Sequence, residues 1–417
     1  MKKRILVRAP ALSRSGYGEQ SRFALRALRS REDLFDIFLI NIPWGNTGEI
    51  SGNDKDRKWI EELIYKTVPN TNIPPDLSLQ ITIPIEFGKM APINIGYTAG
   101  IETTKVAPEW LSKSNEMVDK IITISKHSKA VFENTKYRAQ NDQTGEVVED
   151  YGLQVPIDVV SYSVRNFEPA PVDIKLSTDK NFLVVSQWGP RKNLENTIKW
   201  FVEEFREDED VGLILKTNTV AESIIDRELT TKRLDGLLSH CGEKKCKVYL
   251  VHGDLSPEEL TWIYQHPTMK ALINIGHGEG FGLPLFEAAY NGLPLVTITW
   301  SGQMDFICKP NKKGKQVPLV ARVDYDLQPV QEEAVWPGVV IKESSWAYAR
   351  ETSYKRAIRE ILEKETHCKK RALVLQKHIL KTFTEEAAIN TFVDLLFTKE
   401  ELDITNQIEE MFKDLSV

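Results

Sequence analysis

Two carboxylates flank a glycine-rich stretch in the C-terminal half of the chain. Glu279 and Glu287 have seven residues between them, and an apolar run, Ala271–Ile275, precedes the stretch. This order predicts a buried strand, a tight loop and a helix that starts near Leu283. Glycines let the backbone turn tightly, and the first N–H groups of a helix are free to bind an anion. The stretch therefore predicts a phosphate site, with Glu279 at the loop tip and Glu287 about one turn into the helix.

A pair of cations, Arg191 and Lys192, lies at another predicted junction. The segment Asn181–Ile198 has the pattern of a strand, a turn and a helix, and the two cations occupy the turn. The N-terminus of a helix repels a cation by a few tenths of a kcal/mol to about 1 kcal/mol. The pair therefore indicates an anionic ligand, and two solvated surface side chains are the alternative.

Together, the two motifs resemble those of a known enzyme family. Glu279–Ala288, continued by Asn291–Val296, is similar to the E-x7-E signature of retaining glycosyltransferases of the GT-B fold, family four. The run Pro190–Leu194 is similar to the basic diphosphate motif of that family, although it is shorter than the common form. A structural turn with solvated acids is the alternative interpretation.

The resemblance implies a role for each matched residue. Glu279 would hold the sugar hydroxyls and Glu287 the ribose of a nucleoside diphosphate sugar. Arg191 and Lys192 would neutralise the diphosphate, and which phosphate each one contacts stays open. The donor loop would contain Gly280, Phe281, Gly282 and Leu283.

The predicted strand that starts at Lys247 leads into a further donor candidate. In the resembling family, the loop after this strand holds the nucleobase through backbone groups, which implies His252 and Leu255 here. An ordinary strand end is the alternative. The next helix has Ser256 as its predicted N-cap and Pro257 at its first position.

A glycine loop follows the first predicted strand, Arg4–Arg8. Ser13–Gln20 opens a helix that runs to about Arg29. The resemblance places such a loop near the donor phosphates, so Gly16 and Gly18 are donor-binding candidates. An ordinary tight turn explains them equally well.

The loop after the predicted strand Ile93–Thr98 should also face the ligand, because ligands of α/β sheets bind beyond the carboxyl ends of strands. Many relatives have a histidine near this position that touches the sugar, but this loop has none. Glu102 and Thr103 are the acceptor-side candidates. Ser125 is the predicted cap of the following helix, and His127 is interpreted as a solvated residue of that helix.

Composition favours a cytoplasmic protein. It shows no overall excess of positive charge that would indicate nucleic acid or a membrane as a partner. The chain has 417 residues, 54 Lys and Arg against 60 Asp and Glu, and a net charge of −6. The four cysteines are too scattered for a disulfide framework, and no signal peptide or spanning segment is predicted. Lys309–Lys315, with four lysines, is predicted to be a basic surface loop.

We expect an α/β protein of the GT-B fold, with two Rossmann-like domains that face each other across a cleft. The predicted divisions are an acceptor domain (1–165), a linker (166–179), a donor domain (180–385) and C-terminal helices that cross back to the first domain (386–417). Residues 138–150 are polar, lack periodicity and are interpreted as an excursion at the surface.

The predicted function is retaining transfer of a hexosyl or pentosyl group to a hydroxyl. No Asp-x-Asp cluster lies where a metal would hold the diphosphate, so no metal and no cofactor are expected. The departing phosphate would itself take the acceptor proton. The acceptor is open: a glycan or another cytoplasmic acceptor is favoured over a hydroxymethylated DNA base of the phage type. A nucleotide-sugar epimerase is the alternative, and the intact acid pair argues against an inactive donor-binding subunit.

Overall fold

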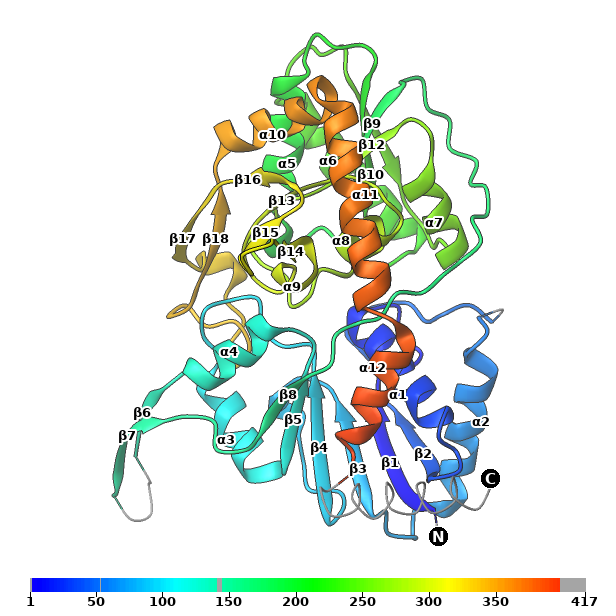
Figure 1. Cartoon of the computed structure of the whole chain (residues 1–417), viewed down its shortest axis with the longest axis vertical. Coiled ribbons are helices and arrows are strands. Elements are labelled where there is room, and N and C mark those ends of the chain that lie inside the picture. Colours follow the sequence, from blue (N-terminus) through cyan, green and yellow to red (C-terminus); the bar gives the residue numbers. More distant parts are fainter. Residues whose placement is uncertain (1, 53, 141–144, 398–417) are drawn as a thin grey trace.

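Two parallel β-sheets, each of six strands, form two layered units stacked along the long axis of the computed structural model (Figure 1). The structure describes residues 2–52, 54–140 and 145–397. Helices cover the sheets, so the strands are rich in buried apolar residues, as a parallel sheet requires.

The first sheet has the strand order β2-β1-β3-β4-β5-β8. Every residue of β3 is buried. The strands are β1 Lys3–Ala9, β2 Phe35–Asn41, β3 Leu77–Ile81, β4 Ile93–Thr98, β5 Lys120–Thr123 and β8 Ile157–Val159. The α-helices between them are α1 Gly16–Arg29, α2 Arg57–Thr67, α3 Pro108–Met117 and α4 Lys126–Asn134.

The second sheet has the order β11-β10-β9-β12-β13-β16. Its strands are β9 Lys180–Val185, β10 Val211–Lys216, β11 Lys247–Val251, β12 Met269–Asn274, β13 Leu295–Ile298 and β16 Ala321–Val323. Its α-helices are α5 Leu194–Glu204, α6 Ile224–Ser239, α7 Pro257–Gln265, α8 Leu283–Tyr290, α9 Met304–Ile307 and α10 Glu351–Glu363. The strand order reverses between β1 and β3 in the first sheet and between β9 and β12 in the second. Ligands of such sheets bind at these switch points.

The chain crosses between the two units twice. All residues from 160 to 179 are described, and none of them lies in a helix or strand. The return crossing joins α11 Glu365–Thr382, which packs on α8, to α12 Glu385–Asp394, which packs on α1. The two crossings touch, because Val164 N donates to Phe383 O at 2.9 Å. Of the C-terminal helices that were predicted to cross back to the first domain, α12 does so. The rest of that segment, residues 398–417, lies outside the described part.

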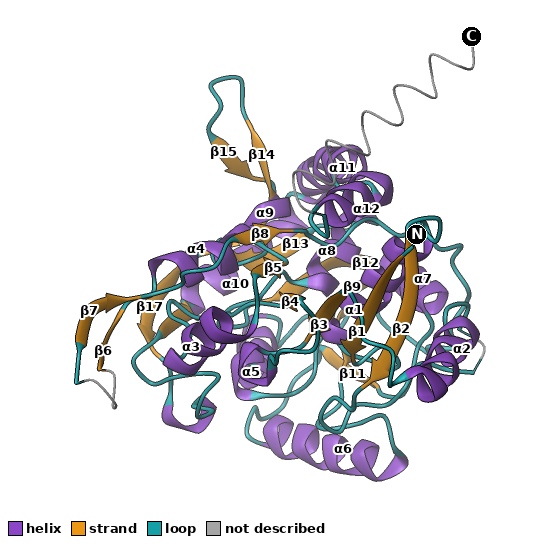
Figure 2. Ribbon diagram, turned by 90° about the horizontal axis from the view of Figure 1, so that it is seen from below, coloured by secondary structure: helices purple, strands orange, loops and turns teal. Residues whose placement is uncertain are grey.

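Two segments that were predicted to lie at the surface belong to exposed hairpins. The surface excursion predicted for residues 138–150 is confirmed for the part that the structure describes. There, β6 Tyr137–Gln140 and β7 Val147–Tyr151 form an antiparallel pair that projects from the molecule (Figure 2). Both faces of this hairpin are largely exposed, so its sequence carries no apolar alternation. The lysine segment, predicted to be a basic surface loop, is exposed and forms most of the tip of a second hairpin, β14 Cys308–Pro310 with β15 Gln316–Pro318. A third pair joins β17 Tyr325–Pro329 to β18 Ser345–Ala349.

Candidate active site

The basic motif and the first acid meet at the switch point of the second sheet. Arg191 and Lys192 follow β9 in a short 3-10 turn, and Glu279 lies in the glycine loop after β12. Lys192 Nζ is 2.6 Å and Arg191 Nη1 is 3.1 Å from the Glu279 carboxylate. Asn274, the last residue of β12, donates a third hydrogen bond at 2.9 Å. The loop therefore presents one carboxylate held by two cations and an amide.

This cluster is largely withdrawn from water. The side-chain exposure is 7% for Glu279, 16% for Lys192 and 30% for Arg191. Burial by itself would raise the pKa of Glu279, but the two cations and Asn274 lower it to about 2. Burial and the neighbouring Arg191 lower the pKa of Lys192. The two cations are thus not solvated surface side chains.

Arg191 also reaches the first domain. Its Nη2 lies 3.3 Å from Glu102 Oε1, so the predicted acceptor-side acid contacts the predicted donor-side cation. Thr103 is placed differently: its side chain is fully buried and donates to Lys105 O inside its own loop. A second ion pair between the domains joins Arg14 and Asp254 at 2.9 Å.

The glycines of the loop after β12 allow two backbones to approach each other. A Cβ added to Gly278 would lie 2.3 Å from Glu102 O, and one added to Gly280 would lie 2.5 Å from Ala99 O. Any side chain at either position would force the two domains apart. Gly282 has a φ of +91° and precedes the first residue of α8, so it makes the sharp turn into the helix.

Two members of the predicted donor loop are packing or helix-start residues. Phe281 is 1% exposed, and its ring lies 5.3 Å from Tyr162 and 5.0 Å from Phe306. It therefore belongs to the core between the domains in this structure. Leu283 is the first residue of α8 and is half-buried.

Glu287 lies on α8, where it is half-buried and accepts a hydrogen bond of 2.9 Å from Tyr264 Oη. Burial raises the pKa of Glu287 to about 7, against the lowering effect of the Tyr264 hydrogen bond. Glu19 and Arg165 of the first half of the chain also act on its pKa, the first raising and the second lowering it. The second acid thus faces the first domain at a place separate from Glu279.

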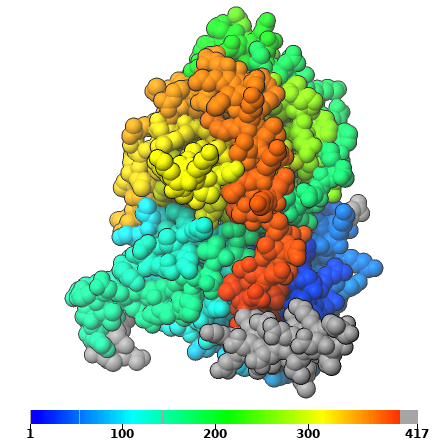
Figure 3. Space-filling view, in the orientation of Figure 1, coloured from blue at the N-terminus to red at the C-terminus, as the bar shows by residue number. Residues whose placement is uncertain are grey.

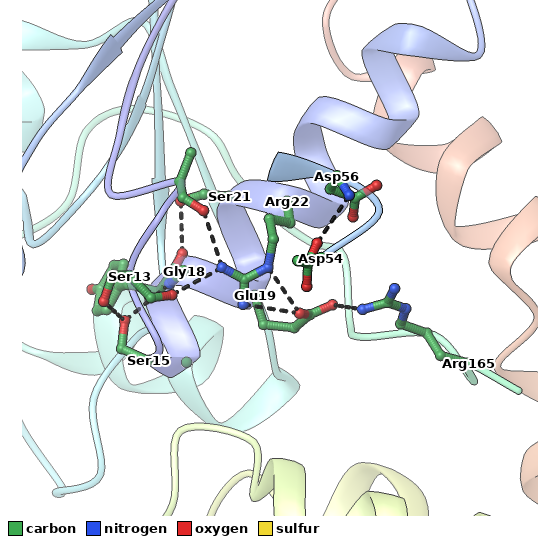
Figure 4. A network of polar contacts seen from close by, with 12 residues as sticks. Ser13, Ser15, Gly18, Glu19, Ser21, Arg22, Asp54, Asp56 and Arg165 are labelled. Atoms are coloured by element: carbon green, nitrogen blue, oxygen red, sulfur yellow. Dashed lines mark hydrogen bonds and ion pairs between the residues drawn. The ribbon is translucent and has the colours of Figure 1, made fainter. Parts of the chain in front are cut away.

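The glycine loop of the first domain opens α1 (Figure 4). Gly16 O accepts from Tyr162 Oη at 2.9 Å, and a Cβ on Gly18 would lie 1.9 Å from Ser13 O. Gly18 is therefore required by a tight turn. One residue further, Glu19 accepts from three guanidinium groups, those of Arg22, Arg26 and Arg165.

The nucleobase candidates lie after β11. His252 Nε2 is 2.8 Å from Asp226 Oδ2, and the same carboxylate accepts from the backbone N–H groups of Thr219 and Val220. The imidazole of His252 is thus engaged within its own domain. Leu255 is half-buried against the core.

His127 was misjudged from the sequence. It is not a solvated helix residue: its ring meets Trp300 edge-on at 5.1 Å, and its buried Nε2 has no hydrogen-bond partner among the described residues. Burial lowers the pKa of His127 to about 4, so the ring is neutral near neutral pH. No local pattern links two residues that lie so far apart in the chain.

Asn274 was not predicted as a site residue. The signal for it was a polar residue inside the apolar run Ala271–Ile275.

Within the described residues, no group of three or more His, Cys, Asp or Glu side chains is arranged to bind a metal ion. None of the described helices combines the length and the apolar character needed to cross a bilayer.

Solved structures share this arrangement over nearly the whole chain. HepE from Anabaena, solved with UDP-glucose, superposes with a TM-score of 0.60 at 13% identity, over 94% of this chain and 99% of HepE. Sucrose-phosphate synthase from Thermosynechococcus elongatus superposes with a TM-score of 0.58 at 14% identity, over 99% of this chain and all of the synthase chain. This chain has the GT-B fold. A glycosyltransferase from Rickettsia africae gives 0.58 at 13% identity, over 95% of this chain and 98% of that one. The fold predicted from the acid and glycine motif is thereby confirmed.

Three curated relatives, all named WbdA, match part of this GT-B chain in sequence. The mannosyltransferase WbdA from Escherichia coli is 28% identical over 197 residues, which are 45% of this chain. The match spans only 22% of WbdA, so the chain corresponds to a small part of that protein. No protein-family model matches the sequence.

Proposed function

We propose that this chain is a retaining glycosyltransferase that moves a sugar from a nucleoside diphosphate sugar to a hydroxyl acceptor without a metal ion. The observation that carries the proposal is the cluster of Arg191, Lys192 and Glu279 at the switch point of the second sheet. The GT-B neighbour HepE was solved with UDP-glucose, and the matching relative is a mannosyltransferase, which supports a nucleotide-sugar donor.

The cluster suits a diphosphate because its two cations are now paired with carboxylates that a diphosphate could replace. Arg191 and Lys192 share the single carboxylate of Glu279, and Arg191 has a second acid, Glu102. A donor diphosphate would bring its own negative charge to the two cations and release Glu279 toward the sugar hydroxyls. The cations and the N-terminus of α8 would then stabilise the leaving group.

The remaining groups complete the proposed reaction. Glu287 would accept from the ribose hydroxyls in place of Tyr264 Oη, which now occupies its carboxylate. In a reaction with retention, the leaving phosphate oxygen can take the acceptor proton, so no separate base is required. The close packing of Gly278 and Gly280 against the first domain would exclude water during transfer.

The acceptor is proposed only as a hydroxyl compound. A glycan is favoured over a modified DNA base, since the matching relative is a serotype-specific mannosyltransferase. A nucleotide-sugar epimerase would use the same donor site without an acceptor, and the mannosyltransferase match favours transfer over epimerisation.

The test is a screen of radiolabelled nucleotide sugars, UDP-glucose and a nucleoside diphosphate mannose first, for release of nucleoside diphosphate. Active donors are then offered to glycan and hydroxymethylated DNA acceptors, and the anomeric configuration of the product is read by NMR. Transfer with retention supports the proposal. Conversion of the nucleotide sugar into its epimer, or a product with inverted configuration, would contradict it.

A further inference from the structure

The β14–β15 hairpin and the outer side of α11 form one basic surface, which we call the α11 face. The hairpin lies beside α11 and projects on the side of the molecule opposite α6 (Figure 2). In the space-filling view, the yellow hairpin and the orange helix share one face (Figure 3). Seven exposed lysines of this face have no salt bridge to a residue that the structure describes: Lys309, Lys312, Lys313, Lys315, Lys370, Lys377 and Lys381.

The charge of this face opposes that of the whole chain. Residues 308–318 and 366–383 contain nine Lys or Arg and no Asp or Glu, whereas the chain has a net charge of −6. Lys369 pairs with Glu365 and Arg371 with Glu360, so these two cations are locally matched. None of the seven exposed lysines forms a salt bridge with a residue that the structure describes. Such a field attracts a polyanionic partner.

Apolar side chains lie between these lysines. On α11, Leu373 is 49%, Val374 42% and Leu380 42% exposed, and Val317 of the hairpin is 37% exposed. Leu373, Lys377 and Leu380 share one side of the helix, since they are spaced by four and three residues. Exposed leucine beside lysine gives one surface both the charge that attracts an anionic bilayer and the apolar side chains that can enter its interface. A surface for single-stranded nucleic acid would instead present aromatic rings for stacking, and none of the exposed large apolar residues of this face is aromatic.

We propose that the α11 face docks on the surface of an anionic lipid bilayer. The lysines contact the headgroups, and the exposed Leu373, Val374 and Leu380 enter the boundary between headgroups and acyl chains. Because α11 packs on α8, which carries Glu287, docking holds the donor domain against the lipid. The proposal does not depend on the reaction that the chain catalyses.

The test is co-sedimentation of the full chain with vesicles of phosphatidylcholine alone or mixed with phosphatidylglycerol. We expect binding only to the anionic vesicles, weakened by salt. Reversal of the hairpin lysines (K309E, K312E, K313E and K315E together) should lower binding at least tenfold. The matched control reverses four exposed lysines outside this face (K89E, K175E, K232E and K342E) and should bind like the original chain.

A second variant separates lipid insertion from attraction to any polyanion. L373S with L380S keeps the charge and should still lower vesicle binding several-fold. The proposal is overturned if the hairpin reversal or L373S with L380S binds anionic vesicles as well as the original chain. It is also overturned if the control variant loses binding equally, or if the chain binds DNA or heparin but no vesicle. Circular dichroism of each variant checks that the fold is intact.

Discussion

Lys192 Nζ lies 2.6 Å from Glu279 Oε1, which joins the basic turn after β9 to the glycine loop after β12. Both side chains are mostly buried, so removing Glu279 leaves the Lys192 charge without its partner, whereas removing Lys192 leaves Glu279 with Arg191 alone. The pair thus joins the basic turn and the acid of the glycine loop into a single unit. In the proposed reaction, this unit has to open when a donor arrives.

The acid should matter for transfer more than for binding. Glu279→Ala is expected to abolish transfer while donor affinity stays within about tenfold, because its contact to the sugar strengthens as charge develops on the ring. Steady-state kinetics and calorimetry with the donor measure the two effects. Glu363→Ala, at an exposed position of α10, is the control. Full transfer activity of Glu279→Ala would contradict the assignment.

The basic pair should carry the affinity for the diphosphate. Arg191→Ala combined with Lys192→Ala is expected to weaken nucleoside diphosphate binding by about 2–5 kcal/mol, because charge-assisted contacts in a partly dry site are lost. Calorimetry with the nucleoside diphosphate measures this change. Lys199→Ala on the neighbouring α5, where the side chain is 56% exposed, should leave affinity unchanged. Equal affinity of the double variant would remove both cations from the donor site.

Transfer should survive complete chelation. The proposed site balances the leaving charge with Arg191, Lys192 and the N-terminus of α8 in place of a divalent cation. Initial rates are compared in excess EDTA and after addition of Mg²⁺ or Mn²⁺. Activity that disappears with chelator and returns with either metal would show that the diphosphate binds elsewhere.

Domain closure should depend on Gly280. A methyl group at this position would lie 2.5 Å from Ala99 O, so Gly280→Ala is expected to hold the domains apart and lower kcat at least tenfold. Small-angle scattering should report a larger radius of gyration. The control is Gly236→Ala in α6, where nothing lies within 4 Å of the added carbon. This substitution should stabilise the helix by about 0.5–1 kcal/mol and leave kcat unchanged. Normal kcat in Gly280→Ala would show that the contact is not needed.

The folded protein should lose stability in acid because Glu19 becomes protonated. Burial would raise the pKa of Glu19, but Arg22, Arg165 and Arg26 lower it to about 2, below the ordinary 4.5. A lowered pKa means that the native state releases the proton more readily than the unfolded chain. The contribution of Glu19 to the free energy of unfolding is therefore fully present above about pH 4.5 and is lost as the pH falls toward 2.

Glu19→Gln tests this contribution by leaving three guanidinium groups without their shared acid. The free energy of unfolding at neutral pH should fall by about 3–5 kcal/mol, as measured by urea titration. The deficit should shrink as the pH is lowered through this range. Glu385→Gln is the control, because Glu385 is 42% exposed and its contact with Arg26 should contribute about 0–1 kcal/mol. A deficit that stays constant with pH would contradict the role of Glu19.

The local elements of the site were predictable, because each is encoded within about ten consecutive residues. The start of α8 at Leu283 is confirmed. Ser125 caps α4, and Ser256 forms a capping box with Pro257 at the first helical position, as predicted. These features depend on backbone geometry and on side chains that reach only the next turn. The sequence alone therefore determined the strand–loop–helix units and the residue types that each loop presents.

Only the tertiary structure decided which side chains meet. Lys192 reaches Glu279 because β9 and β12 are neighbours in the sheet, and this order is not written in either segment. His127 meets Trp300, and Gly280 meets Ala99, because two domains pack together. Contacts between distant segments depend on strand order and domain packing, which are set by the burial of apolar surface over the whole chain. The chemistry of each loop is local, whereas its partners are a property of the fold.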